Sequence, residues 1–261
     1  MKIGLALGSG AVRGYSHIPI IQRLVKEGIK FDYIAGTSIG SIMGAYYCLN
    51  KEFDSMFKIL RNMKKRDFIK LVDLNNPKIS IVKGETIKKF LIDNYFGKKT
   101  FRDVQVPFVI CASNLSTKKP QYFEKGKLID AIMASVSMPG IFPPYKIKED
   151  LFVDGALFHQ VPIDILFKKG MDKVIAVNLN TYDLHVEKNH NAFNVLTTAF
   201  GILMCDSTQR SLNKNVFLLE PKFTEGFADS LKLYDWKEYK EPGKKEINAK
   251  IKDLKKWLRN K

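Results

Sequence analysis

The chain has 261 residues, which is enough for one large α/β domain with a sizeable core. Charged residues make up 27% and hydrophobic residues 45%, which excludes a disordered, collagen-like or wholly membrane-embedded chain. Lysine and arginine total 43 against 27 acidic residues, so the formal net charge is +16. An excess of this size favours anionic partners, such as nucleic acid, acidic lipid headgroups or acidic proteins, without choosing among them.

Cysteine usage and hydropathy predict a cytoplasmic location. Cys48, Cys111 and Cys205 show no short spacing, which argues against a disulfide framework or a zinc site and fits a reducing compartment. The apolar stretch near the N-terminus is interrupted by glycines at 8 and 10, unlike a secretory signal. The uncharged stretch 33–50 is explained better by a buried strand and a buried helix than by a membrane span.

Local patterns predict alternating strands and helices. The first 50 residues show the order strand, glycine loop, helix, strand, tight turn, helix, which favours an α/β fold with a mainly parallel central sheet flanked by helices. Strands are expected at 2–7, 31–35, 107–112, 121–123, 152–153 and 173–179, and helices at 15–27, 41–49, 53–74, 85–95, 128–137, 193–212 and 244–260.

Two of the expected helical regions bear on membrane binding. Residues 51–99 hold thirteen Lys or Arg against six Asp or Glu, which is either a solvated helix surface or a face that docks on anionic lipid. The last helix, 244–260, has an apolar face with Trp257 near its edge. It could anchor in a membrane surface, or pack against the sheet or another subunit.

Gly36-Thr37-Ser38-Ile39-Gly40 matches the G-x-S-x-G pattern of a nucleophile elbow. In such an elbow the serine lies on a sharp strand-to-helix turn, and the two glycines allow the strand and helix to approach closely. The context fits, because an apolar strand precedes the motif and a helical pattern follows it. The pentapeptide alone leaves open a glycine-rich turn with an idle serine.

A glycine-rich loop, residues 8–14, lies between the first strand and the first helix. Backbone N–H groups in such a loop can hold an anion, either a nucleotide phosphate or the oxyanion formed when a serine attacks an ester. Arg13 stands where the dinucleotide fingerprint requires its third glycine, although Asp32 has about the spacing of a ribose-binding acid. A Walker loop is excluded, because no Gly-Lys-Ser/Thr follows.

Asp154-Gly155-Ala156 could be a simple turn, or Asp154 could be the base that activates a serine. Serine hydrolases normally use a histidine for this step. Each of the four histidines is better explained by packing or surface exposure, and a Ser–Asp pair would need none of them. These are His17, His159, His185 and His190.

Taken in order, the glycine-rich loop ending in Arg-Gly, the G-x-S-x-G motif and the D-G-A motif resemble the patatin-like phospholipase family. Residues 134–144, Val161-Pro162 and residues 172–177 are similar to that family as well. The resemblance spans about residues 2–180. It implies a three-layer sandwich related to the α/β-hydrolases, with a catalytic core at 1–180 and a helical extension at 181–261 packed on the same domain.

The resemblance also implies a role for each motif. Ser38 would be the acyl-accepting nucleophile, and Asp154 its general base and the base for the deacylating water. Backbone N–H groups near Gly10 and Ala11 would hold the oxyanion, and Arg13 would add positive charge or fix the loop. The glycine-rich loop is formed by Gly8, Ser9, Gly10, Ala11 and Arg13, and the motif glycines are Gly36, Gly40 and Gly155.

This chain departs from the family in the glycine-rich loop. It has Ala11 where the family usually has glycine, and Ser9 where glycine is common. If position 11 requires a positive φ angle, Ala11 is strained.

The leading hypothesis is therefore a serine hydrolase that cleaves acyl esters of lipids at a membrane surface, without metal or cofactor. Its expected partners are a lipid substrate and an anionic membrane, at the inner face if the chain is peripheral. The alternatives are a dinucleotide-binding protein and a non-catalytic lipid-binding protein on the same fold. A nucleic-acid binder is not expected, because the sequence has no helix-turn-helix, zinc or aromatic RNA-binding signature.

Overall fold

The computed structural model describes residues 1–76, 80–180, 192–224 and 236–260. Its centre is one eight-stranded sheet with the strand order β5-β6-β3-β2-β1-β7-β8, with β4 paired to β3 off this path. The pairs among β3, β2, β1, β7 and β8 are parallel, whereas β4, β6 and β5 extend the sheet with antiparallel pairs. The strands are Ile3–Leu7 (β1), Tyr33–Thr37 (β2), Phe108–Asn114 (β3), Lys119–Phe123 (β4), Tyr145–Ile147 (β5), Asp150–Asp154 (β6), Lys173–Val177 (β7) and Val216–Leu219 (β8).

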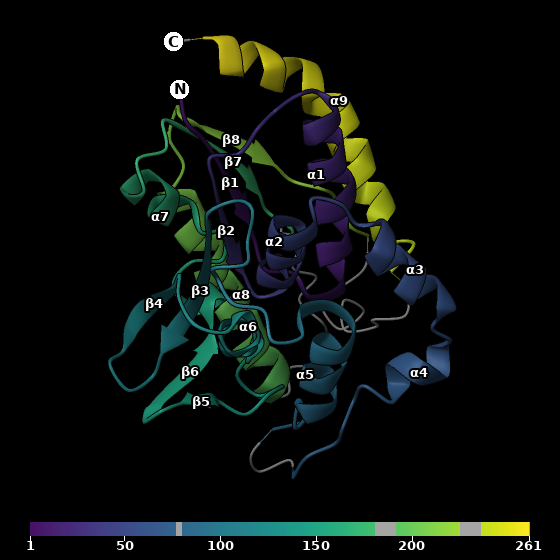
Figure 1. Cartoon of the computed structure of the whole chain (residues 1–261). Helices are drawn as coiled ribbons and strands as arrows, with labels where there is room; N and C mark the ends of the chain where they lie inside the picture. The colour runs from purple at the N-terminus through teal and green to yellow at the C-terminus, as the bar shows by residue number, and fades with distance from the viewer. Residues whose placement is uncertain (77–79, 181–191, 225–235, 261) are drawn as a thin grey trace.

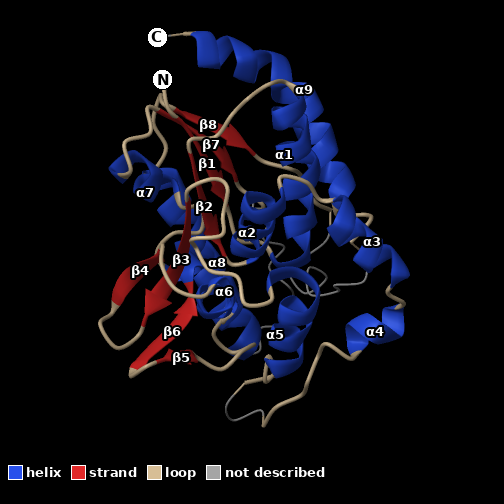
Figure 2. Cartoon of the chain, in the orientation of Figure 1, coloured by secondary structure: helices blue, strands red, loops and turns tan. Residues whose placement is uncertain are grey.

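Helices cover both faces of this sheet (Figures 1 and 2). Alternate residues of a strand point to opposite faces, so Leu5 and Leu7 of β1 join one hydrophobic cluster and Ala6 joins another. The first cluster packs under α1 (His17–Lys26), α2 (Ile39–Asn50) and α6 (Leu128–Val136), and the second under α7 (Ile163–Lys168). Both faces are therefore buried, which is why the central parallel strands are short apolar runs.

A long excursion, residues 51–104, leaves the sheet after α2 and returns at β3. It contains α3 (Asp54–Asn62), α4 (Lys65–Ile69), α5 (Glu85–Leu91) and a π-helical turn at Ile92–Phe96. We call this segment the cap. It lies to one side of the sheet, below and to the right in Figure 1.

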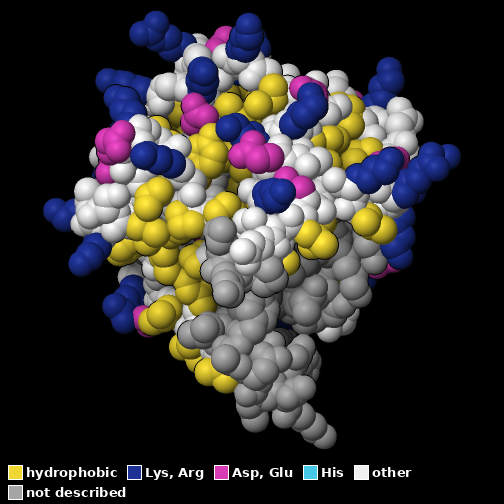
Figure 3. Space-filling model, turned by 90° about the horizontal axis from the view of Figure 1, so that it is seen from below, with side chains coloured by type: hydrophobic (Ala, Val, Ile, Leu, Met, Phe, Trp, Pro, Cys, Tyr) yellow, Lys and Arg dark blue, Asp and Glu magenta, His cyan; other side chains and the backbone are white. Residues whose placement is uncertain are grey.

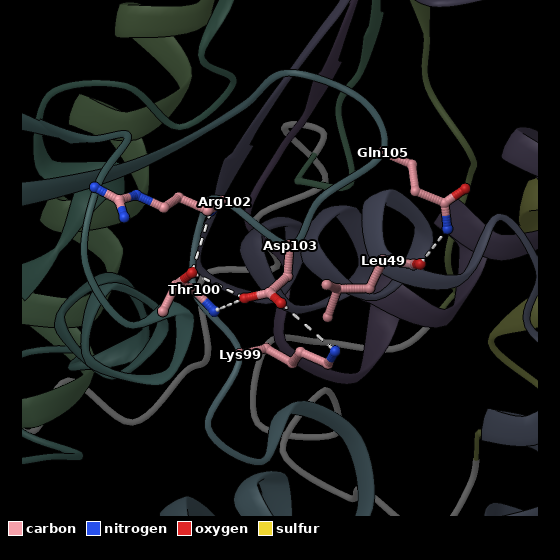
Figure 4. Close-up of polar contacts among 6 residues, drawn as sticks. All are labelled: Leu49, Lys99, Thr100, Arg102, Asp103 and Gln105. Atoms are coloured by element: carbon pink, nitrogen blue, oxygen red, sulfur yellow. Dashed lines mark hydrogen bonds and ion pairs between the residues drawn. The ribbon is translucent and has the colours of Figure 1, made fainter.

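The two ends of the cap are tied to each other (Figure 4). Gln105 donates from its backbone N–H to Cys48 O (2.7 Å) and from its side chain to Leu49 O (2.5 Å), both in the last turn of α2. Just before it, Asp103 accepts hydrogen bonds from the backbone N–H and the hydroxyl of Thr100, each at 2.8 Å. These bonds hold the pKa of Asp103 below its usual value and fix the turn that leads into β3.

In its described residues, 192–224 and 236–260, the C-terminal part contributes a strand and two helices. Strand β8 pairs with β7 and forms one edge of the sheet. Helix α9 (Lys240–Arg259) packs along α1 through Ile247, Ile251 and Leu254, and α8 (Ala192–Arg210) lies near the carboxyl end of β6. Gly243 lets α9 approach the 3-10 turn Ala11–Ser16, since a Cβ added at Gly243 would lie 2.3 Å from Ser16 O.

The predicted α/β fold is confirmed, and several local predictions need correction. The helix expected at 53–74 is broken at Met63 and Lys64 into α3 and α4. The last helix begins at Lys240, not 244, because Pro242 is tolerated in a first helical turn. Its apolar face packs on α1, which favours the packing interpretation over a membrane anchor. Three further elements were not predicted: β5, β8 and α7.

None of the helices in the described residues is long and apolar enough to span a bilayer.

The contact at Gly243 predicts a stability effect. Replacing Gly243→Ala should lower the free energy of unfolding by about 1–3 kcal/mol, the usual cost of overpacking. That cost should exceed the gain of up to about 1 kcal/mol from the better helix propensity of alanine. Chemical denaturation measures the change, and the exposed α9 variant Lys252→Ala is the control, expected within about 0.5 kcal/mol of wild type. A stabilised Gly243→Ala variant would contradict the close approach.

Candidate active site

Ser38 occupies the turn between β2 and α2 in a conformation that is rare for a residue with a side chain. Its φ and ψ angles are 55° and −125°. The turn is sharp because both motif glycines touch backbone. A Cβ at Gly36 would lie 2.5 Å from Gly40 O, and a Cβ at Gly40 would lie 2.1 Å from Leu7 O. The pattern G-x-S-x-G is thus a steric requirement of this strand–helix junction.

The strained turn is held by hydrogen bonds to its backbone. The N–H of Ser38 donates to Ser135 Oγ at 2.8 Å, and that hydroxyl donates to Cys111 O at 2.6 Å. The carbonyl of Ser38 accepts from the N–H and the hydroxyl of Ser41, at 2.8 and 2.6 Å. Ser135 was not predicted as a site residue. Its only local signal is a polar residue within the apolar pattern of α6.

Asp154 lies at the carboxyl end of β6 and is buried. Its backbone is fixed on both sides: its N–H donates to Ser137 O at 2.9 Å, and its carbonyl accepts from Ser113 Oγ at 2.8 Å. Its carboxylate accepts a hydrogen bond from Ala156 N at 2.9 Å, and the Ser38 side chain lies near enough to lower the pKa of that carboxyl. The two motifs, more than a hundred residues apart in the chain, therefore meet side chain to side chain.

The environment of Asp154 tunes its basicity. Burial raises the pKa of this carboxyl to about 6, although the nearby Ser38 hydroxyl and the hydrogen bond from Ala156 N lower it. At neutral pH the group is ionised, yet it binds a proton far more readily than an exposed aspartate. A pKa near the working pH is the property expected of a general base.

The glycine-rich loop lies beside these two residues. Ser9, Gly10 and Ala11 line the same pocket as Ser38 and Asp154. Three of the N–H groups of Gly8, Ser9, Gly10, Ala11 and Arg13 are engaged. Gly8 N donates to Val177 O, Ser9 N to Gln160 O and Arg13 N to Gly10 O, each at 3.0 Å.

Ala11 and Arg13 show two different features of the loop. The φ angle of Ala11 is 48°, so this position does require the left-handed conformation and the alanine is strained. Arg13 is nearly buried and lies outside the pocket lining. Its guanidinium donates to Leu179 O at 3.4 Å and lies 4.9 Å from the centre of the Phe223 ring. These contacts fit a residue that holds the loop in place.

Asn180 and Gln160 were also missed, and both support the loop. The side chain of Asn180 donates to the carbonyl and the hydroxyl of Ser9, at 3.3 and 3.2 Å. Gln160 donates to Asn178 Oδ1 at 2.9 Å, and Asn178 donates to Glu220 Oε1 at 2.9 Å. Isolated amide side chains after a strand give no local signal of such a network.

An apolar pocket of about 340 Å³ extends from Ser38 and Asp154. Its walls are mostly aliphatic and aromatic side chains, and the cap supplies many of them. The cap residues lining it are Met56, Leu60, Phe68, Leu71, Val72, Ile81, Val82, Ile87, Phe90, Leu91 and Tyr95; Met138, Ile141, Phe142, Phe200 and Met204 are among the others.

The sequence profile of the family described as "Patatin-like phospholipase" matches residues 5–167. That range covers all three motifs and most of the sheet. The chain belongs to the patatin-like phospholipase family.

Relatives and solved structures share this region. An uncharacterized NTE family protein of Mycobacterium tuberculosis is 30% identical over 179 residues, which are 69% of this chain and 49% of that protein. A lysophospholipase of Candida albicans is 29% identical over 191 residues, 72% of this chain and 14% of that protein. VipD from Legionella pneumophila has a TM-score of 0.47 at 10% identity, covering 94% of this chain and 67% of that chain. The chain thus spans about half or less of the curated relatives it matches.

In two histidines of this patatin-like chain, the Nε2 atom has a hydrogen-bond partner other than Ser38. His17 is fully buried, its Nε2 lies 2.9 Å from Gly8 O, and burial lowers its pKa to about 4. The Nε2 of His159 lies 2.7 Å from Tyr122 Oη. His185 and His190 lie outside the described residues.

Asp32 does not fit the dinucleotide alternative. It precedes β2, so it lies at the amino ends of the parallel strands, whereas the glycine-rich loop lies at their carboxyl ends. Its carboxylate accepts a hydrogen bond from Ile3 N at 2.7 Å. A ribose-binding acid belongs at the carboxyl edge of the strands, beside the loop. The carboxylate of Asp32 therefore has a structural role, although its distance from the glycine-rich loop in the sequence suggested a ribose-binding acid.

The raised pKa of Asp154 predicts a pH-dependent stability difference. Between its unfolded value near 3.8 and about 6, the native state binds the proton more tightly, so stability falls as pH rises through this window. Asp154→Asn removes that loss. Relative to wild type, the variant should gain about 3 kcal/mol in free energy of unfolding as pH rises from about 4 to about 7.5. Urea titrations across this range measure the difference, and a difference that stays constant with pH would contradict the buried, ionisable carboxyl.

Proposed function

We propose that this chain is a serine hydrolase that cleaves the acyl esters of lipids through a Ser38–Asp154 dyad. The observation that carries the proposal is the proximity of the Ser38 side chain to the buried Asp154 carboxylate, both of which line one apolar pocket. Family membership supports the reaction class, as do relatives named lysophospholipase and neuropathy target esterase.

The geometry supplies a role for each group in acylation. Asp154 accepts the proton of Ser38 as the serine oxygen attacks the ester carbonyl. The oxyanion that forms lies against the glycine-rich loop. Since the N–H groups of Gly8 and Ser9 are engaged, those of Gly10 and Ala11 are the donors we assign to it. The protonated Asp154 then gives its proton to the leaving alcohol, and the acyl group remains on Ser38.

Deacylation reverses these roles. Asp154 takes a proton from a water molecule, the hydroxide attacks the acyl-serine, and the proton returns to Ser38 as the fatty acid leaves. No imidazole takes part, because a carboxyl with a pKa of about 6 already accepts and releases a proton near neutral pH.

The pocket supports a substrate with a long acyl chain. Its lining is almost entirely aliphatic and aromatic, with the polar groups of Ser38 and Asp154 at one place in the wall. We therefore expect esters of long acyl chains to be better substrates than short, water-soluble esters, and we place the reaction at the surface of a membrane or micelle.

A non-catalytic lipid-binding protein is the second candidate, since the apolar pocket alone would serve it. The dyad favours hydrolysis, because binding an apolar chain requires neither a strained serine nor a buried carboxylate beside it.

Labelling with a fluorophosphonate probe tests the nucleophile. The probe should modify Ser38, and Ser38→Ala should abolish labelling while circular dichroism shows an intact fold. The exposed serine variant Ser116→Ala is the matched control and should label as wild type does. Labelling of another serine in Ser38→Ala would overturn the assignment.

The pH profile tests the base. The labelling rate of wild type should rise with pH and level off above about 6, as Asp154 ionises. Asp154→Asn should lower the rate about 10²-fold, the usual scale for a lost general base, and remove this inflection. His159→Gln should keep both the rate and the inflection. A His159 variant as slow as Asp154→Asn would show that the site is a triad.

A further inference from the structure

Large exposed hydrophobic side chains gather in two segments of the described chain. One is the cap segment with Ile69, Val72, Leu74 and Ile81, and the other is α8 with Val195, Ile202 and Leu203. Leu74 is 72% exposed and Leu203 is 62% exposed, so these side chains project into solvent. We call these seven residues the rim. Seen from below, the molecule shows broad hydrophobic patches, with Lys and Arg side chains projecting mostly from the margin (Figure 3).

The rim is the outer side of the pocket walls. Val72 and Ile81 are each 42% exposed and also line the pocket that contains Ser38 and Asp154. Their neighbours in the cap, among them Phe68, line the pocket from inside, and Phe200 and Met204 of α8 do the same. The exposed apolar surface therefore continues into the apolar interior. An exposed hydrophobic surface that leads into an apolar pocket marks an interaction site.

Cations flank the cap side of the rim. Lys64, Lys65, Arg66 and Lys70 of α4 and its ends are all exposed. Asp73 is the acidic residue closest to the rim in sequence, and its carboxylate is occupied within the cap. It accepts hydrogen bonds from Gly84 N, Thr86 N and Thr86 Oγ1, at 2.8, 2.9 and 3.2 Å. An apolar surface bordered by cations is complementary to a bilayer that contains anionic lipid.

We propose that the rim is the docking surface for an anionic bilayer, with its apolar side chains entering the acyl region and the α4 cations against the headgroup phosphates. This inference rests on the proposed function, because it names the surface from which the substrate reaches the site. Docked in this way, an acyl chain passes from the bilayer into the pocket without crossing water. The continuity of rim and pocket favours a lipid occupant over a protein one.

Vesicle binding of rim variants tests the proposal. Leu74 and Leu203 do not line the pocket, so Leu74→Asp with Leu203→Asp should leave Ser38 labelling unchanged. Binding to vesicles of phosphatidylcholine and phosphatidylglycerol should fall at least about 10-fold, since two exposed apolar contacts are replaced by charges. The control is Val25→Asp, a site 41% exposed near the far end of α1, which should bind as wild type does.

A second pair of variants separates the charge contribution. Lys64→Glu with Lys70→Glu should weaken binding to the anionic vesicles by at least about fivefold per site and leave binding to pure phosphatidylcholine vesicles unchanged. Equal loss on both vesicle types would overturn the role of the cations.

A fluorescent reporter shows whether the rim enters the bilayer. Emission of Leu74→Trp should shift to the blue when vesicles are added, whereas emission of Val25→Trp should not. Unchanged vesicle binding by the Leu74 and Leu203 double variant would overturn the proposal. Light scattering gives a second test. If wild type is a dimer and this variant is a monomer that still binds vesicles, the rim is an interface between copies of the chain and the proposal is wrong. If the fluorophosphonate probe does not label Ser38 in the wild-type protein, the proposed function is wrong. The vesicle experiments then still test the docking surface separately.

Discussion

The left-handed conformation of Ser38 is the constraint on which the site depends. It exists because the start of α2 touches the end of β1, with no space for a Cβ at Gly40. That contact fixes the path of α2, and the bond from Ser38 N to Ser135 fixes α6 relative to β2. The backbone of Asp154 is then held by bonds to Ser137, just after α6, and to the hydroxyl of Ser113 on β3. The position of one hydroxyl is thus set by the packing of several elements.

Burial of Asp154 connects the proposed chemistry with stability. An ionised carboxyl in this position destabilises the native state, and the same burial raises its affinity for a proton. A dyad without histidine requires such a carboxyl, because an exposed aspartate is too weak a base at neutral pH. The Ser38 hydroxyl and the hydrogen bond from Ala156 N lower the pKa that burial raises, so the arrangement balances two opposing effects on one pKa.

Local patterns predicted the central strands and the strand–turn–helix order around Ser38, because each follows from short-range sterics and hydrophobic periodicity. The conditional expectation of strain at Ala11 came from comparison with the family, which usually has glycine at this position. The antiparallel pair of β3 and β6 depends on contacts far apart in the chain, which periodicity does not encode. The roles of Ser135 and Asn180 were missed for the same reason. The helix break at Met63 lies in a run of cations whose spacing is as compatible with one helix as with two.

The hydrogen bonds between Gln105 and the last turn of α2 hold the two ends of the cap close together beside the sheet. The length of the cap can therefore change without moving β2 or β3. Insertions, deletions or exchange of the whole segment would reshape the wall of the pocket while the reacting groups stay where they are. Selectivity for chain length can therefore evolve separately from the chemistry, and the cap is a natural unit for building chimaeras between relatives.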